Sequence, residues 1–361
     1  MYLEFFKLKE FPFRLTPDSE FLYMSRAHSR AKAYMDYTVW NREGFVVITG
    51  DIGSGKTTLI QKLLSELDEN VLVAKIFQTQ LDEVEFLQSI LVEFGLNPFN
   101  AKKVELIDML NTFLIENFLQ LKQLLLVVDD AHNLNMKVLE EMRMLSGLET
   151  RKEKLLHVIL VGQPLLNDIL DSPEMEQLLQ RVRLRYHIKS LTERDTCDYI
   201  VHRLRIAGAA EPGSIFNPDT IPIIYKYTGG IPRLINTLCD TCMTCAFADN
   251  VHMVSTSVMN VAIDELQWLP YAKRASAKRN KNYDAPGVDM HRLAADHERL
   301  LSDISDRLGH LDRLVPAMTL LSGRMEKLEN VLTSLLGVLQ DMSEQQKPRR
   351  NELQKMDKYH D

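Results

Sequence analysis

Four short, wholly apolar runs separated by helical patterns constrain the fold of this chain more than any other feature. The runs FVVIT, VLVAKIF, LLLVVD and LLHVILVG begin at Phe45, Val71, Leu124 and Leu155. Strands that are apolar on both faces are typical of parallel sheets covered by helices on both sides. Between the runs, KTTLIQKLLSEL, EVEFLQSILVEF, VELIDMLNTFLIENFL and MKVLEEMRMLSGLE have helical periodicity. We therefore predict an α/β fold with a parallel sheet covered by helices.

After about residue 190 the strand patterns stop, and a small all-helical domain is expected. ERDTCDYIVHRLRIAG, PDTIPIIYKY, GIPRLINTLCDTCMTCAFA and STSVMNVAIDELQWL read as successive helices. The polar and basic stretch PYAKRASAKRNKNYDAPG then predicts a linker. The predicted boundaries are 1–190 for the α/β domain with its N-terminal segment 1–43, 191–269 for a helical lid, 270–290 for the linker, 291–343 for further helices and 344–361 for a disordered tail.

Apolar residues recur at heptad spacing beyond the linker, in two registers separated by Pro316. The first register begins at Leu301 and the second ends at Met342. This spacing predicts two short coiled-coil or bundle-forming helices. A second interpretation stays open, in which these helices fold back on the helical domain.

Composition narrows the class of protein. The chain has 361 residues, of which 45% are hydrophobic and 26% charged, as in soluble globular proteins. Its formal net charge of −7 provides no overall basic footprint for sequence-independent DNA binding. No apolar run reaches the length of a membrane-spanning helix, and the N-terminus has no signal-peptide pattern. We expect a cytoplasmic protein.

The cysteines permit two interpretations. Three of the four, Cys239, Cys242 and Cys245, follow a C-x2-C-x2-C spacing that resembles an iron–sulfur motif. They lie in a stretch with helical periodicity, however, and no fourth ligand follows at a useful spacing. We favour reduced thiols on a helix face over a metal site.

The segment GDIGSGKTT fits the phosphate-binding pattern G-x-x-x-x-G-K-[ST] with a predicted strand before it and a predicted helix after it. Backbone N–H groups of such a loop surround phosphates, the lysine reaches the β and γ oxygens, and the hydroxyl after it binds Mg²⁺. A chance glycine turn would lack these flanking elements. The predicted ATP-binding residues are Gly50, Asp51, Ile52, Gly53, Ser54, Gly55, Lys56, Thr57 and Thr58.

Two carboxylates end the third apolar run, at Asp129 and Asp130. A buried strand that ends on a carboxylate carries a large desolvation cost unless a cation lies beside it. In a P-loop fold this strand ends beside the phosphate loop, so we predict that Asp129 binds Mg²⁺ together with Thr57. The fourth run ends at Gln163, whose amide can orient a water molecule.

Arginines form two further candidate sites. LLQRVRLRYHI places Arg181, Arg183 and Arg185 at alternating positions, which suits an exposed strand face or an arginine finger. TGGIPRLIN places Arg233 at the start of a helix, just after a Gly-Gly turn. From there an arginine can reach across a domain cleft to a phosphate.

Taken in this order, the motifs resemble those of an AAA+ ATPase. PFRLTPDSEFLYMSRAHSRA, NLNMKVLEEMRMLSGLET, LVGQP and GGIPRLINTLCD are similar to the bacterial general secretion pathway protein A group, and within it to the putative secretion ATPases encoded with exosortase (PEP-CTERM) and exopolysaccharide loci. The resemblance covers roughly 1–268. Relatives usually read Asp-Glu-Ala-Gln where this chain has DDAH, so Asp130 stands in the place of a glutamate.

The resemblance implies roles for the matching residues. Asp130 would take the place of the water-activating glutamate, Gln163 that of the first sensor and Arg233 that of the second sensor. Arg181 is the preferred finger, offered to a neighbouring subunit of a homo-oligomer, with Arg183 and Arg185 as the other candidates. PFRLTPDSEFLY would pack against the adenine side of the nucleotide.

The resemblance also implies ATP and Mg²⁺ as cofactors and a role in assembling or regulating a bacterial envelope export system. The protein would be cytoplasmic or peripheral at the inner membrane, and its C-terminal helices would dock an export or membrane protein. Turnover would be slow, because Asp130 is one methylene shorter than glutamate. Two alternatives stay open, a DNA-associated regulator of the transposition-regulator type and a scaffold that binds ATP with very slow turnover.

Overall fold

The computed structural model describes residues 2–41, 44–149 and 153–276 of the chain. The predicted coiled-coil helices at 291–343 and the predicted tail at 344–361 lie outside the described residues. Within them, no helix is both long enough and apolar enough to cross a membrane.

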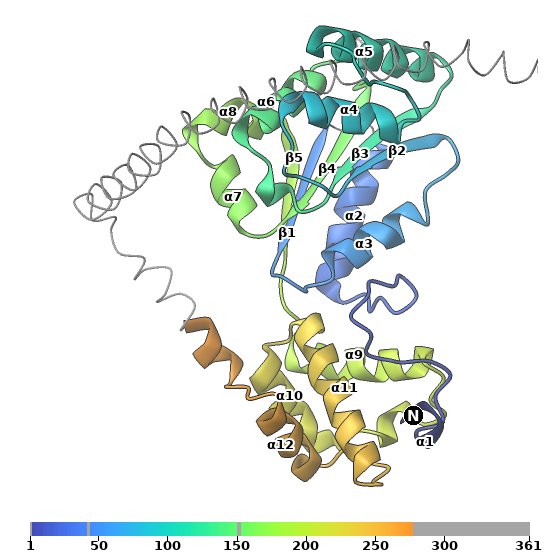
Figure 1. Cartoon of the computed structure of the whole chain (residues 1–361), viewed down its shortest axis with the longest axis vertical. Coiled ribbons are helices and arrows are strands. Elements are labelled where there is room, and N and C mark those ends of the chain that lie inside the picture. The colour runs from blue at the N-terminus through green and yellow to red at the C-terminus, as the bar shows by residue number, and fades with distance from the viewer. Residues whose placement is uncertain (1, 42–43, 150–152, 277–361) are drawn as a thin grey trace, which may run out of the picture. The chain divides into compact units, whose positions relative to one another are not determined.

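A five-stranded parallel sheet forms the centre of the α/β part (Figure 1). Its strands are β1 (Phe45–Gly50), β2 (Val71–Ile76), β3 (Gln123–Val128), β4 (Leu156–Gly162) and β5 (Val182–Ile188), in the order β2-β3-β4-β1-β5. The four predicted strands are therefore present, and the arginine-containing stretch adds a fifth strand at the edge beside β1. All carboxyl ends meet at one edge of the sheet, where the phosphate loop follows β1. The predicted fold class is confirmed.

Helices cover both faces of the sheet because side chains of a strand alternate between the two faces. On one face, Val46 and Ile48 of β1 pack against α2 (Arg26–Trp40) and α3 (Lys56–Leu64). On the other face, Phe45 and Val47 belong to a second core with the remaining helices of this part (Figure 1). These are α4 (Glu83–Glu93), α5 (Lys103–Leu119), the 3₁₀ turn η1 (Ala131–Asn133), α6 (Met136–Leu145), α7 (Leu165–Leu170), η2 (Pro173–Met175) and α8 (Glu176–Leu179).

After β5, all the regular elements among the described residues are helices, as the sequence predicts. They are α9 (Glu193–Ile206), η3 (Pro212–Ser214), η4 (Pro218–Thr220), α10 (Ile221–Thr228), α11 (Pro232–Ala248) and α12 (Thr256–Glu265). Cys239, Cys242 and Cys245 lie on the buried face of α11, where burial raises the pKa of each thiol. Among the described residues, no cluster of side chains has the composition of a metal site.

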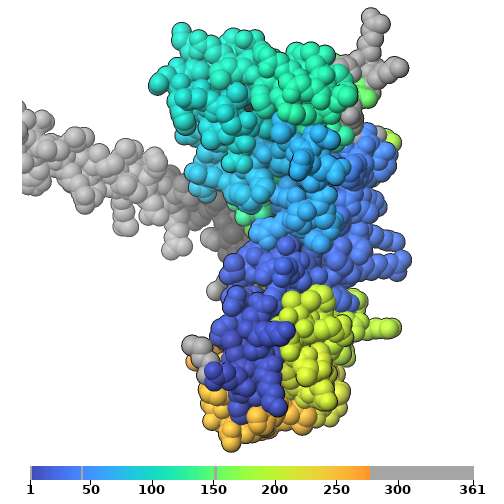
Figure 2. All heavy atoms as spheres, turned by 90° about the vertical axis from the view of Figure 1, so that its right-hand side faces the viewer, coloured from blue at the N-terminus to red at the C-terminus, as the bar shows by residue number. Residues whose placement is uncertain are grey.

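The N-terminal segment packs with these helices although almost 190 residues separate the two in the sequence. Its short helix α1 (Tyr2–Phe5) contacts α11, and Phe13 and Phe21 are buried in the same core as Leu204 and Ile235. Figure 2 shows this segment, in dark blue, against the yellow helices. We predicted it as a part of the α/β domain. The structure instead places the residues up to Phe21 in the helical core, because their aromatic side chains are buried there.

The start of the predicted linker is also packed. Residues 271–276 form a helical turn, and the Arg274 guanidinium lies 4.4 Å from the centre of the Trp268 ring. The linker predicted at 270–290 therefore does not begin before residue 277, which is the first residue of this stretch outside the described part of the chain.

Candidate nucleotide-binding site

The phosphate loop connects β1 to α3 through two glycines with left-handed backbone angles, Gly53 at φ 79° and Gly55 at φ 94°. Such angles strain residues that carry a Cβ atom, so the motif needs glycine at both positions. Lys56 is the first residue of α3, and its ammonium donates to the carbonyl oxygens of Gly50 and Asp51, at 2.9 Å each. Burial lowers the pKa of Lys56, whereas the carboxylates of Asp129 and Asp130 oppose that shift. The lysine is thus held under the loop, in reach of a phosphate.

Thr57 and Asp129 form a direct contact, since the Thr57 hydroxyl donates to Asp129 Oδ2 at 2.6 Å. Asp129 follows the last residue of β3 and is almost fully buried. Burial raises the pKa of Asp129, against the hydrogen bonds from Thr57 and from the Asp130 N–H. A hydroxyl and a carboxylate side by side are oxygen ligands suited to Mg²⁺, whose charge would offset the burial of the carboxylate. The donor set fits the predicted cation.

Asp130 has a left-handed backbone, at φ 50°, and its side chain makes no capping hydrogen bond to η1. Asp130 therefore does not act as a side-chain cap of this 3₁₀ turn. Its carboxylate is 58% exposed and lines the pocket described below. His132 Nδ1 accepts from the Gln163 N–H at 3.4 Å and lies 3.9 Å from Asp130 Oδ1. Burial lowers the pKa of His132, which favours the neutral ring.

Arg233 approaches the phosphate loop from the helical domain. It lies in the first turn of α11, and its backbone N–H donates to the Gly53 carbonyl at 3.2 Å. A Cβ atom built on Gly53 would lie 2.4 Å from the Arg233 Cβ, so the loop and the helix are in tight contact. The structure therefore brings Arg233 beside the phosphate loop, where the sequence predicts it.

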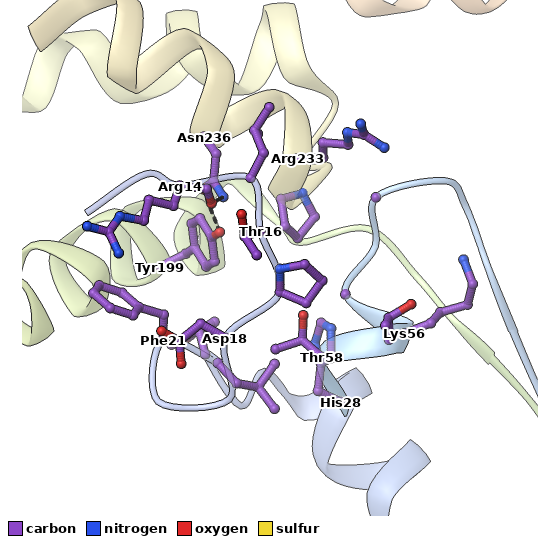
Figure 3. A pocket seen from close by; sticks show the side chains of 18 of the residues that line it. Arg14, Thr16, Asp18, Phe21, His28, Lys56, Thr58, Tyr199, Arg233 and Asn236 are labelled. Carbon is purple, nitrogen blue, oxygen red and sulfur yellow. Dashed lines mark hydrogen bonds between the residues drawn. The ribbon is translucent and has the colours of Figure 1, made fainter. Parts of the chain in front are cut away.

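One pocket, with a volume of about 440 Å³, brings these elements together (Figure 3). Lys56, Thr57, Asp130, Gln163 and Arg233 all line it. Its other walls are the N-terminal stretch from Arg14 to Asp18, the aromatic rings of Phe21 and Tyr23, and α9 and α11. Pockets of this size suit small-molecule ligands. The predicted packing of PFRLTPDSEFLY against the adenine side of a nucleotide remains a prediction.

Three residues of this wall were not singled out in the sequence. The Tyr199 hydroxyl donates to Asn236 Oδ1 at 2.6 Å, and Asn236 Nδ2 donates to the Arg14 carbonyl at 3.1 Å (Figure 3). Arg203 donates from Nε to the Pro12 carbonyl and lies 4.7 Å from the centre of the Phe21 ring. These side chains from α9 and α11 fix the N-terminal stretch against the pocket. No local pattern reveals them, because the contacts with Pro12 and Arg14 span 191 and 222 residues.

His28 is a fourth residue that the sequence did not single out, although it lies within the quoted stretch SRAHSRA. It is buried in α2, and its Nε2 lies 2.9 Å from the Ser54 carbonyl oxygen. Its Nδ1 lies 2.7 Å from the Ser25 hydroxyl. A neutral ring with its proton on Nε2 satisfies both contacts, with Nε2 donating to Ser54 and Nδ1 accepting from Ser25. Burial lowers the pKa of His28, which supports this neutral form.

The arginines around β5 lie away from this pocket. Arg181 precedes β5, whose first residue pairs with Phe45 at the start of β1, so it lies at the opposite end of the strands from the phosphate loop. Its guanidinium donates to the Arg143 carbonyl and to the Ser146 hydroxyl. Arg185 pairs with Asp171 at 2.6 Å, and Arg183 is exposed on the edge strand. A phosphate contacted by Arg181 would belong to a neighbouring subunit.

Comparison with known proteins finds two similarities. Residues 40–170 match the family described as AAA domain. The chain is also similar to general secretion pathway protein A of Aeromonas hydrophila, with 38% identity over 268 residues, which are 74% of this chain and 48% of that protein. The chain thus spans about half the length of this relative, and the narrower exosortase and exopolysaccharide group remains a prediction.

Two solved structures have a similar fold. Cdc6p from Pyrobaculum aerophilum has 18% identity and a TM-score of 0.53, over 69% of this chain and 71% of that one. The ORC2 protein of Aeropyrum pernix, solved as ADPNP-ADP complexes, has 16% identity and a TM-score of 0.51, over 74% of this chain and 69% of that one. At such identity the similarity shows the fold alone.

Proposed function

We propose that this protein is a Mg²⁺-dependent ATPase that hydrolyses ATP slowly and assembles or regulates a bacterial envelope export system. The observation that carries this proposal is the pocket in which Lys56, Thr57, Asp130, Gln163 and Arg233 converge. Each belongs to a different part of the chemistry of phosphoryl transfer to water. The export role is supported by similarity to a protein named for the general secretion pathway.

Each residue of the site would have a separate role in ATP binding or hydrolysis, according to its position. The loop N–H groups and the Lys56 ammonium would bind the phosphates, and Thr57 and Asp129 would hold Mg²⁺, which neutralises charge on the transferred phosphoryl group. Asp130 would accept a proton from the attacking water, which Gln163 would orient. Arg233 would contact a phosphate from the lid. With its shorter side chain, Asp130 holds its carboxylate farther from this water than a glutamate would, which supports slow turnover.

The proposed protein acts as a homo-oligomer, which is supported by the position of Arg181 at the far end of the strands, away from the pocket of its own chain. In such an assembly the guanidinium would leave Arg143 and Ser146 and stabilise the phosphate of the next subunit. The C-terminal segment would then carry the contact with an export or membrane protein, at the inner membrane or in the cytoplasm. The exopolysaccharide connection belongs to this proposal and rests on sequence resemblance.

The test measures ATP hydrolysis by the full chain, with Mg²⁺ and with excess EDTA, over a range of protein concentrations. We expect Mg²⁺-dependent turnover whose specific rate rises with concentration. A mixture of Arg181→Ala and Asp129→Ala chains should recover part of the activity that each lacks alone, because mixed interfaces contain one intact site. A rate that is independent of concentration, with no recovery in the mixture, would exclude the shared site. Stimulation by DNA that falls steeply with salt would favour the DNA-associated alternative.

A further inference from the structure

The residues just after α12 pack on the turn that carries Arg233 to the phosphate loop. In this turn, Gly229 caps the C-terminus of α10 with φ 61°, and Gly230 follows with φ 72°. A Cβ atom on Gly229 would lie 2.3 Å from Cδ1 of Tyr271, so the tyrosine ring lies directly against the glycine backbone. The ring occupies the space that any side chain at Gly229 would need.

Arg274 holds the same turn from the end of α10. Its Nη2 donates to the carbonyl of Tyr227, which lies in the last turn of that helix. Carbonyls there have no partner within the helix, and a cation is favourable at a helix C-terminus. The Trp268 ring lies 4.4 Å below the guanidinium and fixes its direction. Within the described residues, Arg274 Nε is buried without a hydrogen-bond partner. The position of Arg274 therefore costs free energy of desolvation at this N–H group.

The opposite side of the turn meets Leu191, which lies in the connection between β5 and α9. A Cβ atom on Gly230 would lie 2.0 Å from the Leu191 carbonyl oxygen, and the Leu191 N–H donates to the Gly230 carbonyl at 2.9 Å. Three residues after Gly230, Arg233 contacts Gly53 of the phosphate loop through its own N–H. The Gly229–Gly230 turn is therefore packed between Leu191 and Tyr271, and this packing restricts the position of Arg233.

We propose that Tyr271 and Arg274 are positioning residues for Arg233, which couple the start of the C-terminal segment to the nucleotide pocket. The inference rests on the proposed function, because it assigns Arg233 a part in ATP hydrolysis. Residues 271–276 continue directly into the segment that would contact a partner. A partner that moves this helical turn shifts the Gly229–Gly230 turn, and Arg233 moves with it, away from or toward the phosphate loop.

A double-mutant cycle in the full chain tests the coupling. Tyr271→Ala should lower kcat roughly tenfold, because displacement of a catalytic group by a fraction of an ångström to one ångström has effects of this size or larger. In the Arg233→Ala background the same substitution should change kcat less than about twofold, since the group that Tyr271 positions is already gone. Arg274→Ala, which leaves the Tyr271 ring in place, should behave in the same way. Tyr37→Ala, an exposed tyrosine on α2, is the matched control.

The outcomes separate the coupling from the proposed function. Equal losses in both backgrounds would mean that Tyr271 only stabilises the fold, and the inference would be overturned. No loss in the parental background would overturn it as well. If the parental chain binds ATP without turnover, the proposed hydrolysis is wrong, and the same cycle measured in ATP affinity still decides whether Tyr271 acts through Arg233. Thermal unfolding of each variant confirms that the compared chains are folded.

Discussion

The two halves of the pocket are held in different ways. In the sheet domain, formed by α2 and residues 44–188, the phosphate loop, Asp129 and Gln163 each follow the end of a strand, and the parallel pairing of β1, β3 and β4 brings these ends together. In the helical domain, formed by residues 2–21 and 193–268, the wall depends on contacts between distant segments such as Phe13 and Phe216. The sheet domain builds its half from local motifs, whereas the helical domain builds its half from long-range packing. The second half is therefore the easier one to move.

The largest expected effect tests whether the helical domain can unfold independently of the sheet domain. Phe13→Ala removes a buried ring and should lower the free energy of unfolding by about 3–5 kcal/mol. Trp268 reports on the helical domain and Trp40, at the end of α2, reports on the sheet domain, so fluorescence of single-tryptophan variants separates the two. We expect the unfolding transition reported by Trp268 to shift and the transition reported by Trp40 to stay unchanged.

Phe99→Ala, at an exposed ring, is the control. Equal shifts of both transitions would show that the two regions unfold as one.

Within the sheet domain, substitution of Asp130 tests the chemical step of ATP hydrolysis, and we expect the fold to stay intact. Asp130→Ala should lower the single-turnover rate of ATP hydrolysis on the order of 10²-fold, because the acceptor of the water proton is removed. Asp130→Glu should raise that rate, since the longer side chain brings the carboxylate closer to the water. Mg·ATP affinity should change little in both. Asp108→Ala, exposed on α5, is the matched control. Hydrolysis at the parental rate by the alanine variant would place the base elsewhere.

Lys56 tests the binding half of the same site. Lys56→Ala removes a charge-assisted contact to the phosphates and should weaken ATP binding at least tenfold, about 1.4 kcal/mol. Titration with a fluorescent ATP analogue measures the dissociation constant. Lys62→Ala, two turns later in α3 and paired with Glu66 at the surface, should leave that constant unchanged. An unchanged affinity in the Lys56 variant would exclude this loop as the phosphate site.

The smallest expected effect is a change in how stability depends on pH. It comes from His28, which connects α2 to the phosphate loop through Ser54. Its pKa is lowered in the folded state by burial, from an ordinary value near 6.5, so the unfolded chain takes up a proton first as the pH falls. The stability contribution is therefore complete above about pH 6.5 and is lost below it, by at most about 1.4 kcal/mol per pH unit. His28→Gln keeps an N–H donor for Ser54 and should flatten this decline in urea unfolding between pH 7 and 5.5. Equal slopes for both chains would contradict the buried neutral ring.

The sequence by itself determined the sheet domain and most of its site. Gly50 to Thr58 and Asp129 are recognisable because a phosphate loop and an acid-tipped strand need fixed residue types at fixed spacing. In the fold, the strand pairing brings the hydroxyl of Thr57 to Asp129. Gln163 and Arg233 could also be placed, since each follows a strand or turn that the pattern marks. Their roles in catalysis remain proposals.

Only the tertiary structure decided where the N-terminal segment and residues 271–276 pack. Phe13 and Phe21 show the same apolar character in the sequence whether they cover a sheet or a helical core, so the hydrophobic pattern alone cannot choose the partner. Polar contacts such as Arg203 to Pro12 join residues too distant for any periodic signal. Tyr271 stands in a basic, linker-like stretch, yet its ring fits the bare backbone of Gly229. Such complementarity depends on shape in three dimensions, which composition and spacing do not encode locally.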